Sequence, residues 1–421
     1  MKDVSQVTAG FLDYGLFIEM ARVLGKTFKK VFYCNPTWPG NFPRRQEAEI
    51  GTGFDEIEVV HDIFEYMDDI DLLVYSDVGQ GYQQAWLAEQ GKAVWGCRVG
   101  EDLEFYRDAA KQTLESLGLP VGPYEVITGI DSLRKYLKEN KDQIVKIDKW
   151  RGSFETFRSP NYSFIESKLD EIERRFGPMK YDQKFVVEEE LKDKFEAAID
   201  AYNIDGKMPK KTLYGVEIKN LAYAARFVDY ESIPKAMRLF DEKIASILKK
   251  YQYRSFYSPE QRIGKDKKAY MIDMCCRVPS PPNESYQVEY KNLADIIWQG
   301  ANGICIDPIP RAKWVAEALI HSEWACKNFQ PVEFPKEYEE FVKLRNCVKI
   351  KDKYYVVPIE GEMPEIGAVV GYGGTMDEAI NMCKKISETV KGFEIEIKAD
   401  ALDQAAEEID KAREYGAWPL N

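Results

Sequence analysis

The stretch that decides the fold is QIVKIDKWRGSFETF (143–157), because a lysine lies inside a strand pattern and a loop with glycine, hydroxyl and arginine side chains follows it. By the period of two of a β-strand, Lys146 and Asp148 share one face. A partly buried lysine at the edge of a pocket is a point charge suited to phosphate oxygens. Taken alone, the pattern is somewhat more typical of a surface strand with solvated charges.

A second strand pattern, KFVVEEEL (184–191), ends in three glutamates. Backbone groups at such a strand end can pair with an adenine edge, and a carboxylate can accept hydrogen bonds from ribose hydroxyls. Glu196, on the following strand, is a second candidate for the ribose. The alternative interpretation is the acidic start of a helix, where negative charge is favoured.

A third strand pattern, AYMIDMCCR (269–277), carries an acid on one face. Alternation along the strand predicts four side chains on that face: Met271, Asp273, Cys275 and Arg277. Magnesium commonly uses one or two carboxylates and takes its other oxygens from phosphates and water, so Asp273 with Glu260 on the preceding strand would suffice. Cys275 is a poor ligand for a hard cation, whereas Arg277 can stabilise charge on a transferring phosphoryl group. The alternative is an ordinary polar edge strand.

Length and composition limit the class of protein. A chain of 421 residues indicates two or three domains, and 45% apolar with 31% charged residues is typical of a soluble globular protein. The net charge of −13 argues against a broad nucleic-acid surface, although the basic cluster at 207–211 can still meet a phosphorylated metabolite. We find no signal-like segment and no uncharged run of membrane-spanning length, and therefore expect no membrane partner.

The cysteines and histidines of the sequence argue against a zinc site and against a histidine-based mechanism. The eight cysteines are scattered without the spacing of a zinc site, and we expect reduced thiols in a cytoplasmic protein. Only two histidines are present, His61 and His321, so a mechanism that needs a histidine base has little support. His321 lies in a helical pattern, KWVAEALIHSEWACKNF (313–329), where we expect a packing or surface residue.

The first hundred residues alternate between strand and helix patterns, which predicts a parallel sheet covered on both faces. The expected strands are 4–10, 29–35, 55–62, 70–77 and 92–97, and the expected helices are 16–25 and 82–91. Ligands gather at the carboxyl ends of such strands, which here carry Gly10, Asn35, Asp77 and Gly79. The turn GFLDYG (10–15) is not a dinucleotide fingerprint.

The remaining residues mix helices with antiparallel strands. The expected helices are 102–117, 132–140, 163–176 and 233–251. We expect strands at 123–127, an antiparallel pair at 194–207 and 210–218, and a hairpin that turns near 264–267. A strand, a glycine turn and a helix follow at 367–392.

Taken in order, these segments resemble the ATP-grasp ligases, and among them the phosphoribosylamine–glycine ligase branch, over nearly the whole chain. GKAVWGC (91–97) and YRDAAKQTLESLGLPVGPYEVI (106–127) resemble the approach to the ATP-binding region, and QIVKIDKWRGS resembles the lysine strand with its phosphate loop. FVVEEEL resembles the hinge that contacts adenine and ribose, and YMIDMCCR the metal strand. The segment at 367–392 resembles the small C-terminal domain.

The resemblance implies a fold of class α/β, with α+β parts. An N-terminal parallel α/β pre-ATP-grasp domain would span 1–100, an ATP-grasp core 101–330 with a small lid at roughly 122–190, and a small α+β domain 331–421. It also implies ATP and Mg²⁺ (or Mn²⁺) as cofactors and a small carboxylate and an amine as substrates. It permits a homodimer.

The resemblance also implies roles for single residues. Arg107 stands where the family has a phosphate-contacting lysine, and Lys146 stands at the ATP lysine. The expected nucleoside contacts are Glu188, Glu189, Glu190, Leu191 and Glu196. The metal positions are Glu260, Asp273 and Cys275, the catalytic positions Arg277 and Lys146, and the acceptor-substrate positions Lys219, Tyr223 and Arg226.

Several positions depart from the family pattern. The metal-binding Glu and Asn of the family become Asp273 and Cys275, and its GDPE is replaced by VPSPPNES (278–285), where Glu284 is the nearest acid. The N-terminal GxGGREHA turn is replaced by AGFLDYGLFIEMA (9–21). These departures predict substrates other than phosphoribosylamine and glycine. Three hypotheses stay open: a ligase with altered substrates, a catalytically inactive ATP-binding protein, and an acidic scaffold without a ligand.

Overall fold

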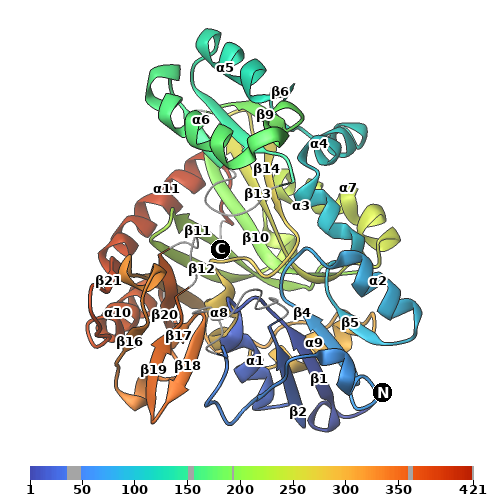
Figure 1. Ribbon diagram of the computed structural model, residues 1–421, viewed down its shortest axis with the longest axis vertical. Coiled ribbons are helices and arrows are strands. Elements are labelled where there is room, and N and C mark those ends of the chain that lie inside the picture. Colours follow the sequence, from blue (N-terminus) through green and yellow to red (C-terminus); the bar gives the residue numbers. More distant parts are fainter. Residues whose placement is uncertain (36–48, 150–155, 192–193, 359–363, 420–421) are drawn as a thin grey trace.

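The computed structural model describes residues 1–35, 49–149, 156–191, 194–358 and 364–419, which form a mixed α/β protein with one parallel sheet and several antiparallel ones (Figure 1). The fold class predicted from the sequence is therefore confirmed. Among these residues, no helix combines the length and the hydrophobicity that crossing a bilayer requires.

The N-terminal sheet is parallel throughout, in the strand order β3-β2-β1-β4-β5. Its strands are β1 (Thr8–Leu12), β2 (Lys30–Cys34), β3 (Glu58–Val59), β4 (Leu72–Tyr75) and β5 (Ala93–Trp95), with α1 (Ile18–Gly25) and α2 (Gly81–Glu89) between them. β1 and β4 are buried along their whole length, as expected for parallel strands that are covered on both faces. The first strand starts later than predicted, because Val4–Gln6 forms a short 3₁₀ turn that the Asp3 side chain caps.

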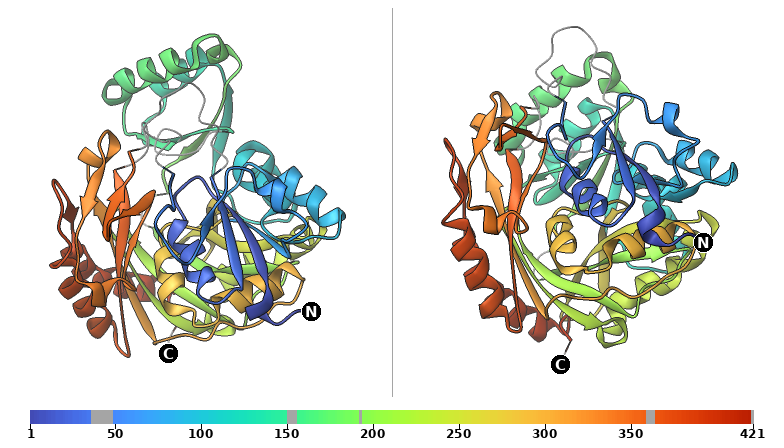
Figure 2. Two further views of the ribbon diagram at one scale, coloured as in Figure 1. Left: turned by 60° about the horizontal axis from the view of Figure 1, so that its bottom comes forward. Right: turned by 90° about the horizontal axis from the view of Figure 1, so that it is seen from below.

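A smaller antiparallel sheet, β6-β9-β7-β8, carries the lysine strand. Its strands are β6 (Tyr124–Thr128), β7 (Gln143–Ile147), β8 (Thr156–Ser159) and β9 (Lys184–Glu189). The helices α5 (Ile130–Glu139) and α6 (Tyr162–Phe176) share one hydrophobic core with this sheet. Together they project from the rest of the chain (Figures 1 and 2).

The large sheet has nine strands in the order β14-β13-β10-β11-β12-β15-β20-β17, with β21 paired to β15. Its strands are β10 (Lys194–Ile204), β11 (Lys211–Ile218), β12 (Ala222–Asp229), β13 (Arg254–Gly264), β14 (Ala269–Cys275), β15 (Trp314–His321), β17 (Val342–Leu344), β20 (Glu365–Gly373) and β21 (Glu396–Ile397). α7 (Lys235–Lys250) covers β10 and β14 on one face. The sheet runs across residue 330, while the domain limits drawn from the sequence stay predictions.

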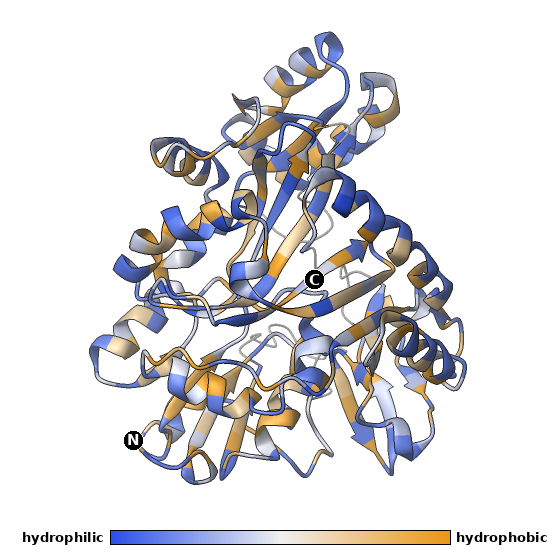
Figure 3. Cartoon of the chain, turned by 180° about the vertical axis from the view of Figure 1, so that it is seen from behind, coloured by the Kyte–Doolittle hydropathy of each residue, from blue (hydrophilic) through white to orange (hydrophobic). Residues whose placement is uncertain are grey.

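The other elements complete the layers around the large sheet. They are α8 (Asn283–Glu289), α9 (Leu293–Ala301), α10 (Met376–Ser387) and α11 (Ala405–Tyr415), and a small sheet of β16 (Gln330–Val332), β18 (Cys347–Ile350) and β19 (Lys353–Val356). Hydrophobic residues gather along the strands, whereas the peripheral helices carry many hydrophilic residues (Figure 3). This distribution follows because the strands are buried between layers, whereas the peripheral helices keep one face in solvent.

Two expectations about local structure were wrong, and one alternative interpretation is excluded. The helical pattern at 313–329 is instead β15, a strand with six consecutive buried residues and with His321 half-buried at its end. A strand covered on both faces reads as a continuous apolar run, which periodicity alone does not separate from a buried helix. The expected helix 102–117 breaks at Tyr106 (ψ 73°) into α3 (Asp102–Phe105) and α4 (Arg107–Ser116). The glutamates of 184–191 do not start a helix, because β9 continues to Glu189.

Candidate functional site

Lys146 connects the small sheet to the edge of the large one. It lies on β7 and is 3% exposed, and its Nζ donates to the carbonyl oxygen of Ile272 on β14 at 2.5 Å. The same nitrogen lies 3.6 Å from an Asp273 carboxylate oxygen and 3.4 Å from a Glu188 carboxylate oxygen on β9. The three strand patterns that the sequence singled out therefore meet at one place, between the two sheets.

A β-bulge shapes this contact on the side of the large sheet. Glu260 of β13 is paired with Asp273, but the next residue, Gln261, is paired with Met271, so that Ile272 is the extra residue on β14. A bulge leaves its extra residue outside the regular ladder and reverses the alternation of side chains. The Ile272 carbonyl is the one that accepts from Lys146. Met271 lies in the hydrophobic core on the α7 side, and the prediction that it shares a face with Asp273 was wrong.

The pKa shifts at this contact indicate a charged pair. Burial acts to lower the pKa of Lys146, but the negative charges of Asp273 and Glu188 outweigh it and raise that pKa. Burial conversely acts to raise the pKa of Asp273, and the positive charge of Lys146 outweighs it, so that this pKa is lowered. The lysine is therefore a cation and Asp273 a carboxylate near neutral pH.

Two more cations, Lys111 and Arg107, lie beside this contact, and Lys111 was not predicted from the sequence. Lys111 of α4 is buried, with its Nζ 3.2 Å from a Glu188 carboxylate oxygen, and burial lowers its pKa. Arg107, one helical turn earlier, donates from its side chain to the Ile147 carbonyl oxygen at 2.9 Å. A spacing of four residues places both cations on one face of a helix, which is the signal that could have identified Lys111.

The acids on the large sheet form a second group. Glu260 and Asp273 lie directly opposite each other on β13 and β14, and burial raises the pKa of Glu260 to about 8. Glu196 of β10 forms an ion pair with Arg262 at 2.7 Å, and Lys219 lies 3.9 Å from Glu196. Lys219 also lies 3.4 Å from Glu217, and the negative charges of the nearby acids, Glu260 first, raise its pKa.

The donor set fits a hard divalent cation that also has phosphate ligands. In the described part of the chain, no three His, Cys, Asp or Glu side chains are grouped closely enough to hold a metal by themselves. Asp273 offers a carboxylate and Glu260 a carboxyl group that a bound cation would favour in its ionised form, and magnesium commonly completes such a pair with phosphate and water oxygens. Cys275, opposite Ser258 at the end of β14, would add only a soft sulfur.

Arg277 ties the site to the N-terminal sheet. Its Nε lies 3.1 Å from a Glu104 carboxylate oxygen and 3.6 Å from an oxygen of Asp77, just beyond β4. Glu104 also accepts a hydrogen bond from the Cys276 backbone at 2.8 Å. The guanidinium is therefore held by two acids on the side of the parallel sheet. One of them, Asp77, follows a strand end at which a ligand was expected.

The remaining hinge glutamates differ in their surroundings. Glu188 is buried against the lysines, whereas Glu189 is exposed. Glu190 forms an ion pair with Arg158 at 2.7 Å, and Leu191 is half-buried beside Gly122. Glu188 thus balances the positive charges of Lys146 and Lys111. The expected phosphate loop at 150–155 lies outside the described residues.

The three expected acceptor contacts do not share one place. The Tyr223 hydroxyl donates to Asp200 on β10, which also accepts from Ser258 at 2.7 Å, and burial raises the pKa of Asp200 to about 6. Arg226, three residues along the same strand, points to the other face of the sheet, where it lies 6.0 Å from the centre of the Trp314 ring. The structure therefore does not bring Arg226 together with Tyr223.

Glu284, the acid nearest to the replaced family motif, belongs to a buried network. It lies 3.1 Å from Arg345, which also contacts Glu365 at 3.1 Å. These partners come from the C-terminal segment, so the Glu284 carboxylate is committed to joining α8 to it. No contact among the residues that the structure describes places it beside Asp273.

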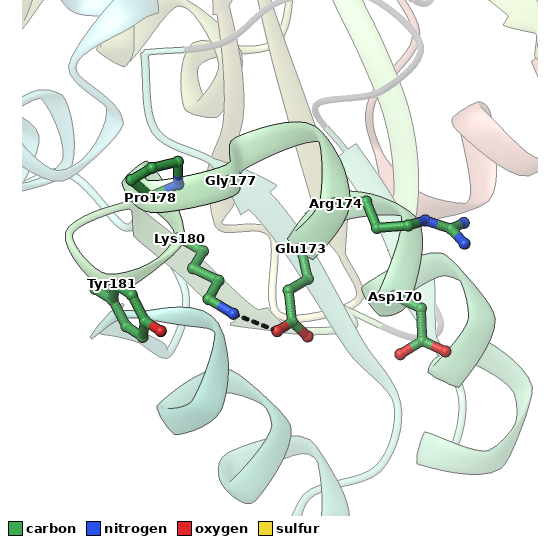
Figure 4. A pocket seen from close by; sticks show the side chains of 7 residues that line it. All are labelled: Asp170, Glu173, Arg174, Gly177, Pro178, Lys180 and Tyr181. Atoms are coloured by element: carbon green, nitrogen blue, oxygen red, sulfur yellow. Dashed lines mark hydrogen bonds and ion pairs between the residues drawn. The ribbon is translucent and has the colours of Figure 1, made fainter.

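A hollow of about 680 Å³ lies elsewhere, on the outer side of the small sheet's helices (Figure 4). Residues of α6 and of the turn after it line the hollow, and an ion pair joins two of them, Glu173 and Lys180. Glu173 forms ion pairs with Lys180 at 2.7 Å and with Arg134 at 3.0 Å, and Arg134 also reaches Asp170. This hollow is separate from the lysine site.

No protein-family model matches the sequence, and no curated protein matches it significantly. Solved structures match over nearly the whole chain. Phosphoribosylamine–glycine ligase from Thermotoga maritima matches with a TM-score of 0.70 and 16% identity, over 94% of this chain and 100% of that one.

Two further solved structures are similar. The biotin carboxylase domain of 2-oxoglutarate carboxylase from Hydrogenobacter thermophilus, in complex with MgADP, ADP and bicarbonate, matches with a TM-score of 0.69 and 10% identity, over 98% of this chain and 96% of that one. N5-carboxyaminoimidazole ribonucleotide synthetase from Thermus thermophilus matches with a TM-score of 0.60 and 12% identity, over 90% and 98%. At such identities the likeness concerns the fold. The chain therefore has the fold of the ATP-grasp ligases, as its resemblance to them predicted.

Proposed function

We propose that the protein is an ATP-dependent ligase that joins a small carboxylic acid to an amine. The observation that carries the proposal is the meeting of Lys146 with Asp273 and Glu188 between two sheets. Cations that can hold phosphates lie there beside the carboxylate pair of Glu260 and Asp273. The solved structures with the same fold include a phosphoribosylamine–glycine ligase and an N5-carboxyaminoimidazole ribonucleotide synthetase.

In this proposal the role of each charged group follows from where it lies in the site. Lys146 and Lys111 lose part of their contact with Glu188 and bind phosphate oxygens, while Arg107 adds positive charge from the end of β7. Glu260 and Asp273 would hold Mg²⁺ or Mn²⁺, and the segment Glu189 to Leu191, with Glu196, would contact the nucleoside. Bound ATP supplies the phosphoryl group that activates the acid. Such a site accelerates the reaction mainly by positioning and charge stabilisation, which needs no histidine.

The proposed reaction needs only ATP, the acid and the amine. A carboxylate oxygen of the acid bonds to the γ-phosphorus as the bond to ADP breaks, which gives an acylphosphate. The amine nitrogen then bonds to the acyl carbon, phosphate leaves, and the nitrogen loses a proton. Arg277 and Lys146 are proposed to stabilise negative charge during these steps. Arg226 lies on the other face of the large sheet. Tyr223 and Lys219 are therefore the two expected acceptor contacts that we keep in the proposal.

We further propose that the substrates differ from phosphoribosylamine and glycine and that the enzyme works in the cytoplasm. The turn after β1 carries Asp13 where the phosphoribosylamine enzymes have a glycine-rich turn. Asp13 is buried, its carboxylate accepts from the Tyr33 hydroxyl at 2.8 Å, and burial raises its pKa to about 6. An acid at this strand end is unfavourable for a phosphorylated substrate.

An ATP-binding protein without ligase activity is the second candidate. It is favoured by Cys275 at a metal position and by the commitment of Glu284 to Arg345. Tight MgATP binding with no turnover on a broad panel of acids and amines would support it.

The test of the first candidate is ADP release from MgATP by the purified chain, with pairs drawn from a panel of amino acids, hydroxy acids and primary amines. A ligase releases ADP faster when a productive acid is added and forms an amide when the amine follows. Absence of MgATP binding in calorimetry would refute both candidates. Binding without any acid-dependent release would refute the ligase alone.

A further inference from the structure

A recess of about 310 Å³ lies on the α7 side of the large sheet, away from Lys146. Three segments form it: the first turns of α7, the turn of the β13–β14 hairpin, and the linker that leads from α4 to β6. Its apolar lining includes Leu119, Pro120, Leu239, Phe240 and Met271. Met271 faces this recess because the bulge at Ile272 separates its side from that of Asp273.

The rim of the recess is positively charged. Lys235, Lys267 and Lys268 line it, all three are exposed, and none lies within 4.0 Å of a carboxylate among the residues that the structure describes. The acid in the same turn, Asp266, accepts hydrogen bonds from the Tyr270 hydroxyl at 2.9 Å and from a backbone amide at 3.3 Å. On a chain with a net charge of −13, three exposed lysines around one cavity favour an anion locally.

The start of α7 adds to this preference. The helix has 16 residues and begins at Lys235 after Pro234, and no side chain caps its first turn. The free amide groups of a helix start, together with the helix dipole, favour negative charge. The dipole and the lysines therefore act on the same mouth of the recess.

We propose that this recess binds a small amphipathic organic anion, with its apolar body against Leu239, Phe240 and Met271 and its phosphate or carboxylate at the lysines. Ligand pockets start at roughly 300 Å³ and pair an apolar lining with a few polar groups. The cavity of about 310 Å³ thus suits a ligand with one ring system or a short acyl chain. This is a second site, on the opposite face of the sheet from the proposed nucleotide site.

The recess also borders the route by which the chain enters the small sheet. The Met271 amide donates to the Pro120 carbonyl oxygen at 3.0 Å, and Lys243 of α7 donates to the Leu117 carbonyl oxygen at 2.6 Å. The linker is thereby fixed to both walls of the recess. A bound ligand would add a contact between walls that already touch, without entering the space beside Lys146.

The test is calorimetric titration of the full chain with 1-naphthyl phosphate, with 1-naphthoate, 1-naphthol and inorganic phosphate as further arms. We expect one site for at least one of the two naphthyl anions, and at least tenfold weaker binding of naphthol and of inorganic phosphate. The stronger anion identifies the headgroup. Saturating MgATP should leave the binding constant unchanged, because the two sites lie on opposite faces.

Matched variants locate the site. The exposed pair Lys235→Gln with Lys268→Gln should weaken binding about tenfold or more, since it removes two charges from the rim. Lys29→Gln with Lys291→Gln, two exposed lysines elsewhere, should not change it. Ala236→Trp should abolish binding by filling the recess while leaving the charge unaltered. Unchanged binding in the rim variant, displacement by MgATP, or equal affinity for naphthol would overturn the proposal.

Discussion

Replacing Lys146 by methionine should weaken MgATP binding by a factor of roughly 10 to 150. The side chain is 4% exposed, so its charge acts in a poorly solvated place, and its methylene chain can be replaced by that of methionine with little change in volume. A hydrogen bond to a charged group contributes about 1.5–3 kcal/mol, and about 1.4 kcal/mol corresponds to a tenfold change in affinity. The loss should appear in the dissociation constant measured by calorimetry at fixed Mg²⁺.

The effect on the free protein should be smaller than for an isolated buried pair, for which removal of one partner costs about 3–5 kcal/mol. Glu188 keeps Lys111 at 3.2 Å, and the Asp273 side chain is 31% exposed and can be solvated in part. Lys184→Met is the matched control, because this lysine lies on the neighbouring strand β9, is half-exposed and pairs with Asp108 at 3.4 Å. A dissociation constant within threefold of the unmodified protein for Lys146→Met would refute the assignment of this residue to the phosphates.

The other predictions concern single groups of the same region. Lys111→Gln should weaken MgATP binding about tenfold, as expected for one charged hydrogen bond, and a calorimetric constant equal to that of the unmodified protein would exclude it from the site. Glu260→Gln should reduce the Mg²⁺ dependence of ATP affinity without loss of folding, which titration of Mg²⁺ at fixed ATP measures. Cys275→Asn should tighten Mg²⁺ binding, because an amide oxygen suits a hard cation better than sulfur; unchanged Mg²⁺ affinity would place this residue outside the metal shell. Asp200 has a folded pKa of about 6, raised by burial above its unfolded value of 3.8. Its contribution to stability is therefore present below pH 4 and is lost as pH rises through 6. Between pH 4 and pH 7, the free energy of unfolding of Asp200→Asn should rise by up to about 3 kcal/mol relative to that of the unmodified protein. Urea unfolding measures both free energies, and a difference between them that does not change with pH would contradict this prediction.

The sequence predicted the meeting of Lys146, Glu188 and Asp273 because their strands follow a recognisable order and because strand periodicity is local. It also predicted the parallel N-terminal sheet, whose strands and helices alternate strongly. The first result depends on the order of three separate segments, and the second depends on alternation along the first hundred residues.

What the sequence did not reveal depends on tertiary contacts. β15 is covered on both faces, so its residues lack alternation and read as a helix. The bulge at Ile272 is set by the pairing of β13 with β14 and shifts Met271 to the other face. Arg226 was placed by resemblance, although its distance of three residues from Tyr223 on one strand already implied opposite faces. Lys111 belongs to none of the three strand patterns, and only the contact of α4 with Glu188 on β9 brings it to the site.

The continuity of the large sheet across residue 330 has a consequence for fragments of the chain. β15 lies between β12 and β20, and a fragment that ends at 330 would keep β12 but lose β20. Eight residues of apolar strand would then form a bare sheet edge, and such edges recruit other chains and aggregate. Limited proteolysis after residue 330 should accordingly yield insoluble material instead of a smaller folded protein. The residues after 330 thus keep the edge of β15 paired and protect the preceding strands from aggregation.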